Sequence, residues 1–257
     1  MPEGDTVYQE ARTLNEVLAD AVLTRCDIRV PTFATVDLSG ERVHDVVSHG
    51  KHLLMRVGEF SIHSHLKMEG SWHVYRHGTP WKRPTYQARA VLETADWVAV
   101  GFDLGVLEVL PTRDEERVVG YLGPDLLGPD WDADEALRRL RASPERPIGL
   151  AVLDQRVMAG LGNVYRVELC FVRGVLPTRA VGEVHDLPRL VDTAHRMLVA
   201  NKDRPNRVTT GNFRQPLWVY GRGGEPCLRC GTGIRSGELG DDELQLRIAY
   251  WCPHDQT

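Results

Sequence analysis

Three cysteines in the last part of the sequence have a spacing that suits a metal ion. Cys227 and Cys230 form a C-x-x-C pair, and Cys252 and His254 follow after 21 intervening residues. Thiolates and an imidazole make the tetrahedral ligand set that zinc prefers, and a metal would stabilise a stretch with so few apolar residues. We predict one structural Zn²⁺ held by Cys227, Cys230, Cys252 and His254, with Asp255 as the alternative fourth ligand. Two unrelated cysteine groups are the simpler interpretation.

The sequence starts with a proline and a glutamate that could do covalent chemistry. Pro2 follows Met1, and Glu3 follows Pro2. Methionine before a small residue is usually removed, which would expose the secondary amine of Pro2. Such an amine can be a nucleophile. Proline is also common at the start of a helix, where it needs no hydrogen-bonded N–H, so these residues alone leave both interpretations open.

Two more residues could bind phosphate groups. Lys51 follows Gly50 at the start of an apolar strand, and its ammonium could neutralise a phosphate or lower the pKa of a nearby amine. Asn163 follows Gly160 and Gly162 at a helix start, where it could cap a helix whose free N–H groups attract anions. An ordinary surface lysine and an ordinary helix cap remain the simpler interpretations.

Four histidines, His49, His52, His63 and His65, raise the possibility of a metallohydrolase. His63 and His65 are two apart on an expected strand and therefore face one side. However, no carboxylate joins them at ligand spacing, which argues against this class.

The elements around these residues differ between the two halves of the chain. Val7, Ala11, Leu14 and Leu18 recur at helical spacing, and Thr6 with Gln9 fits a capping box. Short apolar or alternating segments then predict a β-sandwich or barrel over residues 21–110. The expected strands are 22–30, 52–57, 60–66, 70–75, 88–93 and 106–110. After a loop-rich boundary, helices are expected at 132–142, 147–160, 163–174 and 186–201.

Composition indicates a soluble globular protein. The chain has 257 residues, of which 42% are hydrophobic and 26% charged, and its five cysteines do not suggest a disulfide scaffold. We expect a cytoplasmic protein, since neither a secretory signal nor a membrane-spanning run is visible. The net charge of −5 hides basic segments at 48–89, 136–181 and 201–235, which could form a phosphate-binding surface.

The motifs occur together in one known family. The sequence resembles the bifunctional DNA glycosylases of the formamidopyrimidine-DNA glycosylase and endonuclease VIII family, through MPEG, GKHLL, HLKMEG, LDQRVMAGLGNVY and VYGRGGEPCLRCGT in that order. The resemblance implies an α+β multidomain fold. Its expected parts are a catalytic domain at 1–118 with an N-terminal helix and an antiparallel β-sandwich, a linker at 119–132, a helix-two-turn-helix domain at 133–220, and a zinc-finger β-hairpin at 221–257.

The same resemblance implies an enzyme of base excision repair, a DNA N-glycosylase and AP lyase. Pro2 would form a Schiff base with the sugar of a flipped nucleotide, Glu3 would transfer protons, and β,δ-elimination would cut the strand. Lys51, Asn163 and Arg247 match the phosphate-holding residues. Lys67 and Met68 lie in the loop that fills the vacated stack. The other interpretation of Met68 is a core residue.

One departure from the family pattern bears on the substrate. An Arg-Phe-Gly wedge is absent where the chain has GFDLGVLEVL, which favours the endonuclease VIII branch and oxidised pyrimidines over oxidised purines such as 8-oxoguanine. Thr6 replaces a family carboxylate near the nucleophile. The resemblance implies a monomer that binds damaged DNA, as duplex, bubble or single strand, and that associates with the nucleoid. No membrane partner is expected. A catalytically silent damage-binding protein is the remaining alternative.

Overall fold

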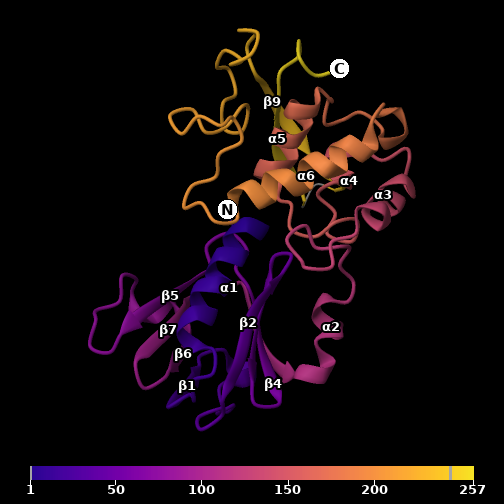
Figure 1. The fold of residues 1–257 in the computed structure, drawn as a ribbon. Coiled ribbons are helices and arrows are strands. Elements are labelled where there is room, and N and C mark those ends of the chain that lie inside the picture. Colours follow the sequence, from indigo (N-terminus) through magenta and orange to yellow (C-terminus); the bar gives the residue numbers. More distant parts are fainter. Residues whose placement is uncertain (1, 243–244) are drawn as a thin grey trace. The chain divides into compact units, whose positions relative to one another are not determined.

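The chain divides into two units, Met1–Tyr121 and Leu122–Thr257, each shown in Figure 1. The structure is a computed structural model that describes residues 2–242 and 245–257. The division falls inside the segment 119–132, where the sequence suggests a linker.

The N-terminal unit contains helix α1 (Gly4–Leu18) and two four-stranded antiparallel sheets. The first sheet has the order β1 (Arg25–Ile28), β6 (Ala88–Glu93), β7 (Trp97–Phe102), β5 (Ser71–Arg76). The second has the order β2 (Val43–His49), β3 (His52–Val57), β4 (Phe60–His65), β8 (Val106–Pro111). The short helices of this unit are η1 (Pro31–Phe33), η2 (Thr85–Gln87), η3 (Thr112–Asp114) and α2 (Glu116–Val119).

Helix α1 and both sheets share one hydrophobic core. The apolar stripe expected from the sequence, Val7, Ala11, Leu14 and Leu18, is buried in it. The helix begins at Gly4 with Glu3 as its N-cap residue, so the capping box expected at Thr6 is wrong. Because side chains alternate along a strand, the second sheet turns one face to this core and a more polar face away from it.

The C-terminal unit is helical up to residue 201. It contains α3 (Ala133–Arg141), α4 (Ile148–Ala151), α5 (Asn163–Arg173), η4 (Val181–Glu183) and α6 (Leu187–Asn201). The helix expected over 147–160 is wrong beyond Ala151. The Gln155 side chain donates to the carbonyls of Leu153 and Leu161, and its own carbonyl accepts the N–H of Gly160. These side-chain bonds replace helical ones and stabilise a turn before α5.

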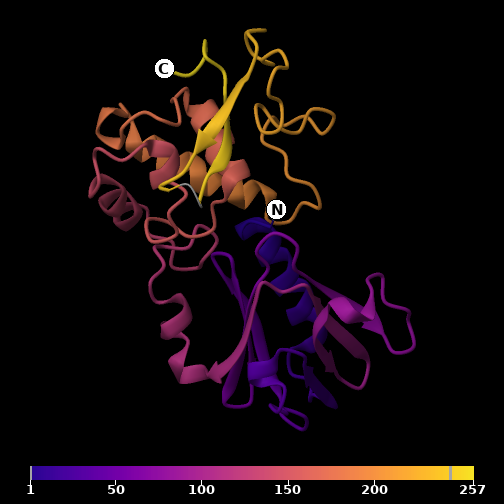
Figure 2. The same cartoon turned by 180° about the vertical axis from the view of Figure 1, so that it is seen from behind.

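A two-stranded hairpin, β9 (Arg235–Leu239) and β10 (Arg247–Trp251), completes this unit. Figure 2 shows the hairpin beside α5, and a small core of Val167, Phe171, Val219 and Ile234 joins the two. Over residues 2–242 and 245–257, no helix is long and apolar enough to span a membrane.

Candidate functional site

The proposed nucleophile lies at the start of α1. Pro2 is partly buried, and the side chain of Glu3 is fully buried. The carbonyl of Glu3 accepts the first helical hydrogen bond, from Val7 N–H at 3.1 Å. Burial of the stripe behind Val7 therefore holds the Pro2–Glu3 pair at the positive end of the helix dipole.

Lys51 lies in a two-residue turn between β2 and β3. His49 and His52 pair across this turn, and Gly50 has a φ of +58°, a left-handed conformation that favours glycine. Helix α1 packs against β2, the strand that leads into Lys51. Lys51 is thus held at the end of a strand that contacts the helix of the proposed nucleophile.

Lys67 and Met68 lie in the tight turn that joins β4 to β5. Leu66 is buried in the core, and Gly70 N–H donates to the Leu66 carbonyl at 2.9 Å. Met68 is 56% exposed at the tip of this turn, so it is not a core residue.

The histidines of the second sheet form a hydrogen-bonded chain. Nδ1 of His63 lies 2.7 Å from the Glu108 carboxylate, Nδ1 of His52 lies 2.7 Å from Nε2 of His63, and Nε2 of His52 lies 3.0 Å from the Tyr121 hydroxyl. An ionised carboxylate only accepts hydrogen bonds, so Nδ1 of His63 donates to Glu108. Nδ1 of His52 then donates to Nε2 of His63, and the Tyr121 hydroxyl donates to Nε2 of His52.

This chain opposes the metallohydrolase interpretation, because both ring nitrogens of His52 are already in hydrogen bonds. Burial, followed by the charges of neighbouring groups, lowers the pKa of His52 to about 3. His52 therefore stays neutral in the folded protein.

Asn163 and Arg247 lie close together in the C-terminal unit. Asn163 is the first residue of α5, and Gly162 is the N-cap, so the predicted cap role of Asn163 is wrong. Its amide instead donates to the carbonyl of Ile248 at 3.0 Å, beside Arg247 at the start of β10. The Asn163 side-chain oxygen is buried and has no hydrogen-bond partner in the described part of the chain, whereas Arg247 is exposed.

Sequence reasoning missed two buried charges on α5. Arg166 is fully buried and donates to the carbonyls of Arg247 and Ile248. Glu168, also fully buried, accepts backbone N–H groups of residues 218–220 and the hydroxyl of Thr209, and so anchors the segment before the hairpin. Two charges in the apolar run NVYRVELCFV were the available signal.

The three cysteines form a group with Asp255, and their ligand atoms lie within 4.8 Å of one another. Sγ of Cys230 lies 3.4 Å from Sγ of Cys252, and Sγ of Cys227 lies 3.1 Å from an Asp255 oxygen. Zinc–sulfur bonds of about 2.3 Å in a tetrahedron require roughly 3.8 Å between sulfurs, so a small expansion would admit the ion. Backbone N–H groups also point at Cys227 and Cys252, as suits thiolates.

The two candidates for the fourth ligand, His254 and Asp255, are placed differently relative to the cysteines. The His254 side chain is 69% exposed and lies outside this group, and its Nδ1 meets the Asp255 carboxylate at 3.2 Å. Asp255, the alternative ligand, lies in the group with the three cysteines and could complete a set of four.

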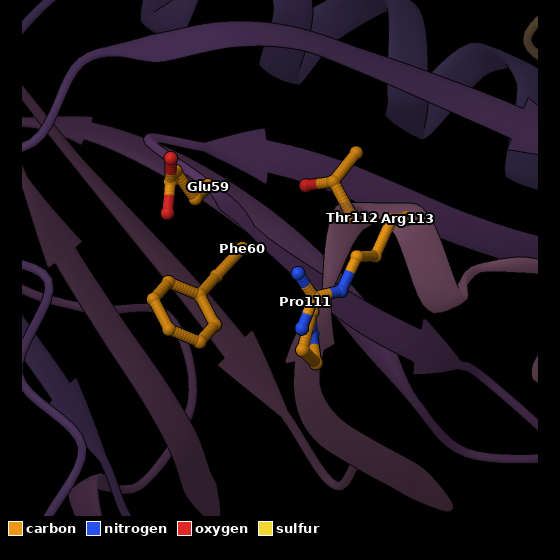
Figure 3. A pocket seen from close by; sticks show the side chains of 5 residues that line it. All are labelled: Glu59, Phe60, Pro111, Thr112 and Arg113. Atoms are coloured by element: carbon orange, nitrogen blue, oxygen red, sulfur yellow. The ribbon is translucent and has the colours of Figure 1, made fainter.

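A surface hollow lies in the N-terminal unit. Figure 3 shows its lining, Glu59, Phe60, Pro111, Thr112 and Arg113. Phe60 begins β4, whereas the turn with Lys67 follows the other end of that strand. The hollow is therefore separate from the turn that carries Lys67 and Met68.

Two family models match the chain in sequence order. The formamidopyrimidine-DNA glycosylase N-terminal domain matches residues 1–103, and the formamidopyrimidine-DNA glycosylase H2TH domain matches residues 122–200. The fold and the motifs are therefore those of a DNA glycosylase.

Relatives over the full length give the same result. "Probable endonuclease 8 2" of Streptomyces coelicolor is 55% identical and covers 100% of this chain and 94% of its own length. "DNA-(apurinic or apyrimidinic site) lyase Nei2" of Mycolicibacterium smegmatis is 54% identical, and the match covers 100% of this chain and 99% of that relative. The chain belongs to the formamidopyrimidine-DNA glycosylase and endonuclease VIII family, in the endonuclease VIII branch, which confirms the predicted family.

A solved structure confirms the fold class. MutM in complex with DNA that contains carbocyclic 8-oxo-G superposes with a TM-score of 0.83 at 23% identity, over 100% of both chains. At this identity the likeness supports the α+β architecture alone.

Proposed function

We propose that this protein is a bifunctional DNA glycosylase and AP lyase of base excision repair that removes oxidised pyrimidines through a Schiff base at Pro2. The observation that carries the proposal is that Pro2 and Glu3 directly precede α1, with Glu3 buried as its N-cap residue, in a chain of this family. Names of relatives such as "Endonuclease 8 2" support the same activity.

In the proposed reaction, the Pro2 nitrogen attacks C1′ of a flipped nucleotide, and the damaged base leaves. Glu3 protonates the ring oxygen as the sugar opens, so that an iminium joins Pro2 to C1′. Loss of the C2′ proton then expels the 3′ phosphate, and a further elimination expels the 5′ phosphate. The positive end of α1 favours the neutral, nucleophilic form of the amine.

Lys51, Asn163 and Arg247 would hold the phosphates that flank the flipped nucleotide. Lys51 supplies a point charge, and the exposed guanidinium of Arg247 can bind a phosphate through two N–H groups. The amide of Asn163 has a second N–H beyond the one given to Ile248. Lys67 and the exposed Met68 would fill the space left in the stack.

Zinc bound by Cys227, Cys230, Cys252 and Asp255 would hold the hairpin that carries Arg247. The ion has a structural role in this proposal and takes no part in the chemistry. Damaged DNA would be bound by a monomer.

Borohydride trapping tests the proposal. Oligonucleotides with an abasic site, dihydrouracil, thymine glycol or 8-oxoguanine are incubated with the wild type, Pro2→Gly and Glu3→Gln. We expect a covalent adduct that disappears in Pro2→Gly, with pyrimidine lesions ahead of 8-oxoguanine. An adduct that survives Pro2→Gly would move the nucleophile to a lysine, and no adduct on any substrate would leave a damage-binding protein.

A further inference from the structure

The turn that carries Lys67 and Met68 is held by features beyond its own sequence. The backbone N–H of Lys67 donates to Nδ1 of His65, the last residue of β4, at 2.9 Å. Lys67 has a φ of +55°, a left-handed conformation that a lysine rarely adopts without support. The hydrogen bond to His65 supplies that support, because it fixes the N–H of Lys67.

Gly105 gives a second support from the loop before β8. A Cβ added at Gly105 would lie 2.7 Å from Cβ of Lys67 and closer still to its Cγ. Because Gly105 has no side chain, the aliphatic part of the Lys67 side chain can pack against it. Since the Lys67 Cβ is fixed by the backbone, a methyl group there would displace the turn itself.

The His65 ring has the protonation state that this bond requires. It packs edge-on against His52, with ring centroids 5.0 Å apart. Burial, followed by the charges of Lys67 and Lys51, lowers the pKa of His65 to about 4. The ring is therefore neutral at ordinary pH, and Nδ1 can accept the Lys67 N–H.

We propose that His65 and Gly105 are positioning residues that hold the Leu66–Gly70 turn with Met68 exposed, ready to enter the stack when a nucleotide is flipped. The inference rests on the proposed function and assigns to it two residues that do not themselves perform the chemistry. Leu66 in the core and the Gly70 bond to its carbonyl fix the two ends of the turn. The Lys67 N–H bond and the Gly105 gap then fix its middle.

Three variants separate this role from a merely structural one. His65→Ala removes the acceptor, whereas His65→Asn keeps it, because an asparagine oxygen readily accepts the N–H two residues ahead. Gly105→Ala fills the gap under Lys67. Each is compared with the wild type in single-turnover excision of dihydrouracil from a duplex and from a single strand, with Met68→Ala as the reference for a lost wedge.

The duplex alone contains a stack that must be filled. We expect His65→Ala and Gly105→Ala to slow duplex excision about tenfold, as the loss of one hydrogen bond or a comparable clash allows. Excision from the single strand should stay within about twofold, and His65→Asn should behave as the wild type. In a Lys67→Gly background, Gly105→Ala should have no further effect, because the clashing side chain is gone.

Equal losses on both substrates would overturn the proposal, as would a His65→Asn variant as slow as His65→Ala. A wild type that never acts on duplex would also overturn it, since no stack would then need filling. Failure of the proposed function gives a different result, namely no borohydride adduct of the wild type with any strand.

Discussion

Acid should destabilise the N-terminal unit through His52, and the structure sets the size of the effect. His52 is 8% exposed, and its pKa falls from the ordinary 6.5 to about 3. Below pH 6.5 the unfolded chain takes up a proton at this residue, while the folded chain does so only near pH 3. As far as His52 is concerned, the free energy of unfolding is therefore highest above pH 6.5 and declines as the pH falls from 6.5 towards 3. Between pH 7.5 and pH 5 the loss from His52 is about 2 kcal/mol.

The perturbation is His52→Gln, which cannot take up the proton. This variant is expected to be less stable than the wild type at pH 7.5, because it disturbs the bonds to His63 and Tyr121. Its stability should nevertheless fall by about 2 kcal/mol less on going to pH 5. Other groups also titrate in this range, so the difference between the two proteins is the diagnostic quantity.

Urea unfolding followed by tryptophan fluorescence at pH 7.5, 6 and 5 measures this difference. His44→Gln is the control, because His44 is an exposed histidine on β2 of the same sheet. An NMR titration of the His52 ring gives its pKa directly. Parallel stability curves for wild type and His52→Gln, or a ring that titrates above pH 6, would refute the reasoning.

Three further predictions concern other acidic residues. Burial raises the pKa of Glu10 to about 8 and outweighs the opposing effect of the hydrogen bond from Trp72 N–H. Because the unfolded chain loses this proton near pH 4.5, the stability of the folded chain falls as the pH rises from 4.5 to 8. Relative to the wild type, Glu10→Gln should gain about 3.5 kcal/mol of stability between pH 5 and pH 8, as urea unfolding would show. Asp255→Ala should lower bound zinc, measured by elemental analysis, while His254→Ala keeps about one ion per chain; the reverse order would restore His254 as the ligand. Glu168→Gln should loosen residues 209–220 in hydrogen exchange, because it replaces a buried carboxylate that accepts three N–H groups; unchanged protection would contradict this.

The strands and long helices follow closely from apolar spacing, but their ends and two strands do not. Residues 163–174 and 186–201 were expected to be helical, and α5 and α6 lie there. The strands β2 and β7 were not among those expected. The sequence of β2, VHDVVSH, does not alternate regularly between apolar and polar residues. The strand has a register shift between Val43 and Asp45, where the period of two is interrupted.

The site could be predicted where a motif is local and not where it depends on tertiary contacts. Pro2, Lys51 and the three cysteines are visible as short motifs. The choice between His254 and Asp255 depends on how the chain turns after Cys252, which spacing alone does not define. The role of Arg166 and the bond from Lys67 to His65 likewise depend on backbone positions that only folding brings together.

One departure from the family pattern is offset within the same helix turn. Thr6 stands where the resemblance implies a carboxylate near Pro2, yet Asp5, one residue earlier, is 3% exposed at the start of α1. Its carboxylate accepts the N–H of Thr6 at 2.8 Å and the hydroxyl of Thr6 at 3.4 Å. A helix N-terminus favours negative charge, so Asp5 is electrostatically stabilised there. The start of α1 thus carries two buried carboxylates, Glu3 and Asp5.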